Sequence, residues 1–289
     1  MNGWWQDLTD LVLPTECGGC GRPRTVLCPR CRAVLSHGAP RRVRPVPEPS
    51  GLPEVYAAAP YADAARAALL AHKERGALAL ARPLGTALAG AVRAGLRAVA
   101  TGAGGTGAGA GAAAGAAGEA VLLVPVPSAR RAVRARGHDP ARRIALAAAG
   151  GLRRSGTPAR ALAVLHQRRV VADQSGLTSR QRLENLAGAL EVTAGGARLL
   201  LSGPVVLVDD VMTTGASLAE AARAVTTAVY TARGREGMRK RKSGSRQKER
   251  KEGNSMYVAP EMAGVYGAGG VVCAAVVAAS PDSFGIDRN

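Results

Sequence analysis

The chain has 289 residues, of which 47% are hydrophobic and 21% are charged, and this balance excludes a disordered chain. Aromatic residues make up only 3% of the sequence, which argues against a nucleic-acid binder built on base stacking. The net charge of +18 predicts polyanionic partners, namely nucleic acid, nucleotides or phosphosugars. No apolar stretch of the length that a membrane span needs is free of charged residues, so we expect no membrane insertion and a cytoplasmic location.

Shifts in composition divide the chain into four regions. Residues 1–45 hold four of the five cysteines, and residues 46–97 form a helical segment that we expect to act as a hood. Residues 98–120 consist almost wholly of Ala, Gly and Thr, which is typical of a flexible linker or surface loop. Residues 121–289 form the core, with an atypical basic insert at residues 227–269.

The second region opens with a short apolar run, Val55–Ala59. Farther along it, Leu84, Leu88, Val92 and Leu96 recur every four residues. This spacing places the four side chains on one stripe, so it predicts an amphipathic helix.

Beyond residue 120, short apolar runs alternate with helical patterns. The first three runs are Val121–Val124, Ala161–Leu165 and Val205–Val208, and Val271–Ala279 follows as a further buried strand. Short apolar runs ahead of turns rich in Gly, Ser or Arg are typical of βα units with a parallel sheet. The sequence therefore predicts an α/β fold with a mainly parallel sheet flanked by helices.

The N-terminal region carries two cysteine pairs at metal-ligand spacing, Cys17, Cys20, Cys28 and Cys31. Two pairs of thiolates, each separated by two residues, suit tetrahedral Zn²⁺. A redox pair or disulfides are the alternatives, although a cytosolic chain rarely keeps structural disulfides. The zinc would be structural, because four thiolates leave no open position for a substrate.

The strongest site signal follows the apolar run Val205–Val208. Two acids, Asp209 and Asp210, come next, and a turn rich in hydroxyl groups leads into a helix at about Ser217–Ala224. Ligands of open α/β sheets bind at the carboxyl ends of the strands. Free backbone N–H groups at a helix N-terminus suit a monophosphate. The residues that would surround it are Thr213, Thr214, Gly215, Ala216 and Ser217.

The two carboxylates before this turn can accept hydrogen bonds from two sugar hydroxyls. A phosphate site and a diol site in this order together predict a cradle for a phosphorylated ribose. The alternative is an ordinary helix N-cap. A cap needs only one Asp, Ser or Thr, whereas this turn has several.

These residues resemble the signature of the type I phosphoribosyltransferases, which is an apolar strand, two acids and a Thr-Thr-Gly turn. More closely, the chain resembles the ComF family of competence-associated, type I phosphoribosyltransferase-like proteins. The further matching segments are the cysteine box at 17–31, Lys73 to Gly76, Val124 to Pro127 with Arg136 and Gly137, and the segment with Gln174, Arg182 and Asn185. The resemblance covers roughly residues 5–225 and resumes at residue 270.

The resemblance implies a type I phosphoribosyltransferase-like core with a small N-terminal zinc-knuckle subdomain. It implies that the chain binds 5-phosphoribosyl-1-pyrophosphate (PRPP) with Mg²⁺ and transfers the phosphoribosyl group to an acceptor, for which a nucleobase is one candidate. Asp209 and Asp210 would be the catalytic residues and contact the ribose hydroxyls, and residues 213–217 would hold the 5-phosphate. The family also implies a link to DNA uptake.

Polar and basic residues of other segments are candidates for the pyrophosphate, since arginine suits bidentate phosphate contacts. For any one of these arginines, the alternative is a solvated helix surface. The pyrophosphate candidates are Ser128, Arg130, Arg131, Arg136 and Lys73, and the flexible-loop candidates are Arg168, Gln174, Arg182 and Asn185.

The basic run at residues 233–252 contains ten Lys or Arg and three Glu, a net charge of +7, with almost no apolar side chain. We expect this run not to pack and to be disordered. It could bind nucleic acid electrostatically without sequence preference. The alternative function is therefore a non-catalytic accessory of DNA uptake, whose zinc knuckle and basic surface contact single-stranded DNA or a helicase partner.

Overall fold

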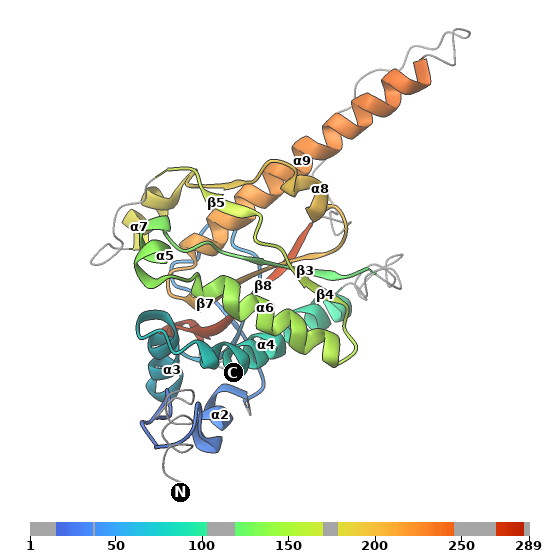
Figure 1. The fold of residues 1–289 in the computed structure, drawn as a ribbon. Helices are drawn as coiled ribbons and strands as arrows, with labels where there is room; N and C mark the ends of the chain where they lie inside the picture. Colours follow the sequence, from blue (N-terminus) through green and yellow to red (C-terminus); the bar gives the residue numbers. More distant parts are fainter. Residues whose placement is uncertain (1–15, 37, 103–118, 170–178, 246–269, 286–289) are drawn as a thin grey trace, which may run out of the picture.

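A six-stranded, mostly parallel sheet with helices on both faces forms the body of the protein (Figure 1). The computed structural model describes residues 16–36, 38–102, 119–169, 179–245 and 270–285, and for 102, 179, 180 and 236–245 it describes the backbone alone. The predicted α/β class, with a mainly parallel sheet flanked by helices, is confirmed.

The strand order shows how distant parts of the chain meet. The order across the sheet is β1 (Arg41–Val43), β2 (Val55–Pro60), β8 (Val271–Ala279), β7 (Val205–Met212), β3 (Val121–Pro125) and β4 (Ala159–Ala161). Within this six-stranded sheet, only the β1–β2 pair is antiparallel. A parallel sheet is buried on both faces, which is why its central strands are continuous apolar runs of Val, Leu and Ala.

Alternate residues of the central strands supply two separate cores. Leu123 and Val206 pack with α3 (Asp63–Glu74), α4 (Ala81–Gly102) and α6 (Pro140–Arg154) on one face. Leu122 and Leu207 pack against α9 (Ala216–Ser245) and α8 (Gly196–Leu200) on the other face. The period of two along each strand therefore produces a helix–sheet–helix arrangement.

On the first face, α4 and α6 approach each other closely at Gly85. A Cβ atom at this position would lie 2.5 Å from the Cβ of Ala147 and 2.8 Å from the backbone nitrogen of Ala148. Only a residue without a side chain permits this approach, so Gly85 sets the distance between the two helices.

The remaining elements lie at the edges of this body (Figure 1). A separate two-stranded antiparallel sheet joins β5 (Leu165–Gln167) to β6 (Leu190–Val192), with α7 (Ser179–Leu186) beside it. The other short elements are α2 (Pro29–Ser36), α5 (Arg130–Arg136), η1 (Leu78–Leu80) and η2 (Pro281–Ser283).

The segments predicted as a hood, residues 46–97, and as a core, residues 121–289, are joined through the central sheet. β2 pairs in parallel with β8 along most of its length, and α4 packs in the same core as β3 and β7. Residues 46–97 therefore contribute strand β2 to the central sheet, and α3 and most of α4 to one of its faces. Helix α4 also continues to Gly102, into the range predicted as a linker, and most of that range, residues 103–118, lies outside the described residues.

Two predicted elements differ from those observed. The run Ala161–Leu165 is not one strand, because β4 ends at Ala161 in the central sheet and β5 begins at Leu165 in the second sheet. The helix predicted at Ser217–Ala224 continues as α9 to Ser245. The expected disorder of the basic run is therefore wrong for residues 233–245, whose backbone is helical and projects from the body (Figure 1).

Candidate functional site

A cleft of about 490 Å³ opens at the carboxyl ends of β3 and β7. This volume lies within the range of small-molecule sites in proteins. Its walls come from α3, from the β3–α5 connection and from the start of α9, which are far apart in the sequence. The predicted site residues that line it are Lys73, Ser128, Arg136, Asp209, Asp210, Thr213 and Ser217.

The two acids at the end of β7 are held by the backbone and by Lys73. The N–H of Asp210 donates to Oδ1 of Asp209 at 2.8 Å, and the N–H of Val211 donates to Oδ1 of Asp210 at 2.8 Å. Lys73 Nζ lies 3.1 Å from Oδ2 of Asp210, whose side chain is 9% exposed. One oxygen of each carboxylate is thus fixed by the chain, and Asp210 is neutralised by a residue of α3.

The electrostatics of these groups are coupled. Burial, and then the neighbouring carboxylate of Asp210, raise the pKa of Asp209 well above its usual value, while Lys73 opposes this shift. The negative charge of Asp210 raises the pKa of Lys73. The cleft therefore holds the charged Lys73 beside Asp210. A further cation or hydrogen-bond donor would stabilise the ionised form of Asp209.

The turn from Thr213 to Ser217 offers unused donors. Among the described residues, no protein group accepts from the backbone amides of this turn or pairs with its three hydroxyls. The first N–H groups of a helix have no acceptor within the helix, so the start of α9 is favourable for an anion. Thr213 and Ser217 both line the cleft, so at least these two face open space.

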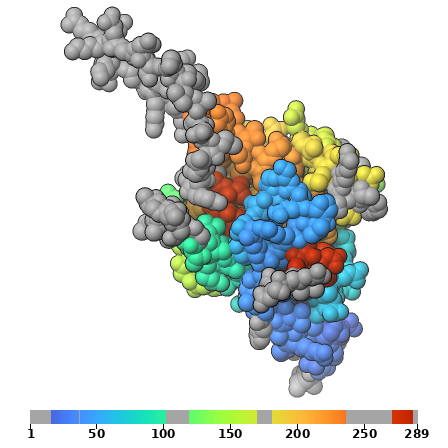
Figure 2. All heavy atoms as spheres, turned by 180° about the vertical axis from the view of Figure 1, so that it is seen from behind, coloured from blue at the N-terminus to red at the C-terminus, as the bar shows by residue number. Residues whose placement is uncertain are grey.

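Gly215 gives the turn its shape. Its φ is +75°, in the left-handed region that favours glycine. A Cβ atom at this position would lie 3.0 Å from Cδ2 of Leu52 and 3.3 Å from Cγ of Pro45. In the view from behind, the segment around residue 50 lies against the region of α9 (Figure 2). This segment therefore supports the turn from the side away from the cleft.

A second link joins the wall of α3 to the end of α5. Arg136 Nε lies 3.1 Å from Oε2 of Glu74, and Nε2 of His138 lies 3.2 Å from the carbonyl oxygen of His72. The rings of His72 and His138 are 5.5 Å apart, and burial lowers the pKa of His72. These contacts hold the backbone next to Lys73 against the backbone next to Arg136.

Several predicted residues do not reach the cleft. Arg130 and Arg131 are exposed on α5 and do not line it. Arg168 lines a different hollow beside β6 and α9. Arg182 and Asn185 lie on α7 and do not line the cleft, and Gln174 lies outside the described residues.

Sequence reasoning missed the residues that cover the cleft. Gln167 of β5, Leu186 of α7 and Leu190 of β6 line it, together with Tyr61 after β2. The small β5–β6 sheet and α7 therefore line the cleft together with residues of the 46–97 region. The run Ala161–Leu165 is apolar throughout, so it carried no signal that the chain changes sheets there.

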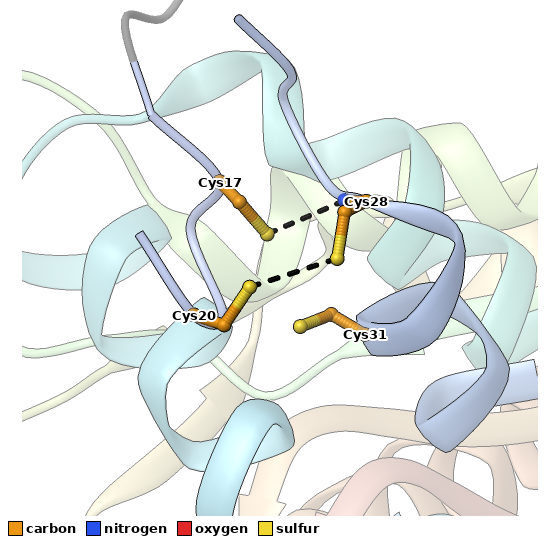
Figure 3. Close-up of side chains that lie close together, drawn as sticks. All are labelled: Cys17, Cys20, Cys28 and Cys31. Carbon is orange, nitrogen blue, oxygen red and sulfur yellow. Dashed lines mark hydrogen bonds between the residues drawn. The ribbon is translucent and has the colours of Figure 1, made fainter. Parts of the chain in front are cut away.

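The four N-terminal cysteines converge on one point (Figure 3). Their sulfur atoms all lie within 4.8 Å of one another, and Cys20 Sγ is 3.6 Å from Cys28 Sγ. The N–H of Cys28 donates to Sγ of Cys17 at 3.3 Å. Four sulfurs around zinc at about 2.3 Å would be about 3.8 Å apart, so this cluster could hold a metal ion such as zinc.

The surroundings of the cluster shift the pKa values of its thiols in different directions. Burial raises the pKa of Cys17, but hydrogen bonds from the backbone of Cys28, Cys20 and Gly19 outweigh it and lower this pKa to about 6. Burial and contact with the other sulfurs raise the pKa of Cys31. A Cβ atom at Gly19 would lie 2.8 Å from Sγ of Cys31, so the turn permits no side chain there.

Comparison with models of known protein families gives no match, and comparison with curated proteins gives none either. In the described part of the chain, no helix is both long and apolar enough to cross a membrane. The functional conclusion therefore depends on the geometry of the cleft and on the residues that resemble a known signature.

Proposed function

We propose that the protein is a type I phosphoribosyltransferase-like protein that binds PRPP with Mg²⁺ and transfers its phosphoribosyl group. One observation supports this more than any other. A single cleft brings together the acids and the hydroxyl-rich turn after β7 with Lys73 and Arg136, which lie 60 or more residues away along the chain.

Each wall of the cleft fits one part of PRPP. The unbonded amides and hydroxyls at residues 213–217 suit the 5-phosphate, because they add neutral donors to the favourable dipole of α9. The second oxygen of each carboxylate, which for Asp210 also contacts Lys73, suits a ribose hydroxyl. Arg136 and Ser128 line the same cleft and are the residues proposed to contact the pyrophosphate.

The chemistry follows from this orientation. The bond between ribose C1 and pyrophosphate breaks, the electron pair leaves with the pyrophosphate, and an acceptor forms the new bond at C1. Lys73 and Arg136 would stabilise the charge that develops on the leaving group, and no covalent bond to the protein is needed. Mg²⁺ would be held mainly by pyrophosphate and ribose oxygens, as suits an ion that binds few protein ligands.

The cysteine cluster is assigned a structural role in this proposal. Four thiolates would complete the coordination of zinc and leave no position for a substrate. Gly18 of the cluster packs against Leu80, and α2 shares the core of α3 and α4. Zinc would thus anchor the segment that supports α3, from which Lys73 reaches the cleft.

The direct test measures ligand-induced stabilisation. PRPP with Mg²⁺ at 100 times its dissociation constant would stabilise the fold by about 2.7 kcal/mol. Each kcal/mol raises the melting temperature by about 2–4 °C for a chain of this size, so we expect a rise of about 5–10 °C. The double variant Asp209→Asn, Asp210→Asn should lose this rise.

The matched control is Asp282→Asn, which removes an exposed carboxylate outside the cleft and should keep the full rise. No rise for the unmodified chain at millimolar PRPP would contradict the proposal. An equal rise in the double variant would also contradict it, because the ligand would then bind elsewhere.

A further inference from the structure

A second basic feature lies on the face of the molecule that carries α4. Two adjoining hollows, of about 480 and 290 Å³, are bounded by α2, α4 and the end of α6. They share Ser36 and Thr86 in their linings and so adjoin each other, and we call the two hollows together the α4 groove. Helices α4 and α6 lie side by side there, with α2 below α4 (Figure 1).

Arginine supplies every charge in the α4 groove. The five arginines in its lining are Arg32 of α2, Arg82, Arg93 and Arg97 of α4, and Arg154 of α6. Neither lining contains Asp or Glu. Within the described part of the chain, none of the five forms an ion pair, and Arg93 only approaches Oγ of Ser155 at 3.4 Å.

The sequence spacing of the arginines on α4 matches the period of an α-helix. Arg82, Arg93 and Arg97 differ by 11 and 4 positions, which places them on one face of α4. From Arg82 to Arg97 the helix rises by about 22 Å. One strand of B-form DNA carries a phosphate about every 3.4 Å along its axis, so the groove matches the axial span of about six phosphates.

We infer that the α4 groove binds the phosphodiester backbone of a nucleic acid. Unpaired arginines in a row suit successive phosphates, since each guanidinium can donate two hydrogen bonds to one phosphate. The groove has no aromatic side chain in its lining, so bases have no surface on which to stack. Binding should therefore ignore sequence and weaken steeply with salt. The groove contains none of the residues that line the cleft, so this inference goes beyond the PRPP proposal.

The test compares two triple variants of the full chain. Arg82→Gln, Arg93→Gln, Arg97→Gln removes three charges from the groove. Arg66→Gln, Arg160→Gln, Arg198→Gln removes three exposed charges that line none of the hollows described above. Both variants have the same net charge and keep the basic run at 233–252. Affinity for a labelled oligothymidine and for a labelled duplex of equal length is measured by fluorescence anisotropy at increasing potassium chloride.

The groove variant should bind at least one of the two probes about tenfold or more weakly, and its slope of log affinity against log salt should fall by about 2–3. The control variant should keep most of the affinity and slope. The probe that loses more affinity identifies whether a single strand or a duplex is bound. Equal losses in the two variants, or no loss in the groove variant, would overturn the inference.

The melting rise with PRPP separates this inference from the proposed function. The groove variant should keep that rise in full and melt, without ligand, near the unmodified chain. Loss of nucleic-acid affinity together with a lowered melting temperature would show a folding defect, in which case the single variant Arg97→Gln decides. This exposed residue should still lower the salt slope by about 0.7–0.9, and an unchanged slope would overturn the inference.

Discussion

The cysteine cluster and the cleft are built in different ways. The four sulfurs come from a segment of 15 residues, Cys17 to Cys31, and their backbone turns bring them together. The cleft unites residues of α3, the β3–α5 connection and the β7–α9 turn, and Lys73 is separated from Asp210 by more than 130 positions. A local site depends on spacing along the chain, whereas the cleft depends on the strand order of the sheet.

This difference predicts different responses to mutation. A change in a local cluster should remove its metal and destabilise the segment around it. A change in the cleft should affect the ligand, the pH dependence of stability, or both. A change at the contact between α4 and α6 should lower the stability of the fold and leave the cluster intact.

The largest effect is expected for Cys31→Ser. Three remaining thiolates would leave zinc incompletely coordinated, and loss of a structural metal is among the few single changes that cost about 4 kcal/mol or more. Metal analysis of the purified chain should fall from about one zinc to well below one, with a lower melting temperature. Cys273→Ala, in the buried strand β8, should keep its zinc. Equal zinc content in the Cys31→Ser chain would show that the cluster is not the metal site.

Gly85→Ala tests the close contact between α4 and α6. The added methyl group would meet the backbone of α6, with 2.8 Å to the nitrogen of Ala148, and overpacking of this kind costs about 1–3 kcal/mol. Chemical denaturation should show the loss, while the zinc content stays unchanged. Gly150→Ala is the matched control on α6, where the new Cβ meets only the side-chain ends of Arg154 at 3.4 Å and Arg153 at 3.9 Å. This control should be neutral or more stable by up to about 1 kcal/mol. A stabilised Gly85→Ala chain would contradict the close packing of α4 and α6.

Asp209 should make stability depend on pH. Its pKa is raised in the folded state, so the folded chain binds more protons than the unfolded chain between the unfolded pKa, near 3.9, and the raised value. Stability contributed by this group therefore decreases as pH rises through that window. Asp209→Asn should flatten this decrease. At pH values above the raised pKa, this variant should be more stable than the unmodified chain. Denaturation at a series of pH values measures this, and parallel curves for the two chains would contradict the raised pKa.

The smallest effect separates two arginines of α5. Arg136→Gln should weaken PRPP binding by about tenfold, or about 1.4 kcal/mol, because its guanidinium lines the cleft. Arg131→Gln should leave the affinity within about twofold, because this exposed side chain does not line it. Calorimetric titration distinguishes the two. Equal losses of PRPP affinity in the two variants would mean that the arginines act through long-range charge and not through contact with the ligand.

The parts of the fold that sequence predicted well are those dominated by buried apolar runs. Val121–Val124, Val205–Val208 and Val271–Ala279 correspond to β3, β7 and β8, because strands buried on both faces have a continuous apolar signal. The run Ala161–Leu165 misled because one apolar run served two sheets. The end of α9 was missed because charged residues are good helix formers even where they do not pack.

The site was predictable to a similar degree. The acids and the turn after β7 stand together in the sequence, so their local arrangement could be read from it. The separation of Arg136 from Arg131 could not be predicted, since it depends on which side of α5 faces the cleft. Gln167, Leu186 and Leu190 carried no signal, because an amide and two leucines have many ordinary roles.

A crystal structure of the chain soaked with PRPP and Mg²⁺ tests the central proposal most directly. The proposal predicts the 5-phosphate within hydrogen-bond distance of the amides at Thr213 to Ser217, and the ribose hydroxyls on Asp209 and Asp210. A ligand whose phosphate lies outside this turn, or a turn left empty at saturating PRPP, would contradict it.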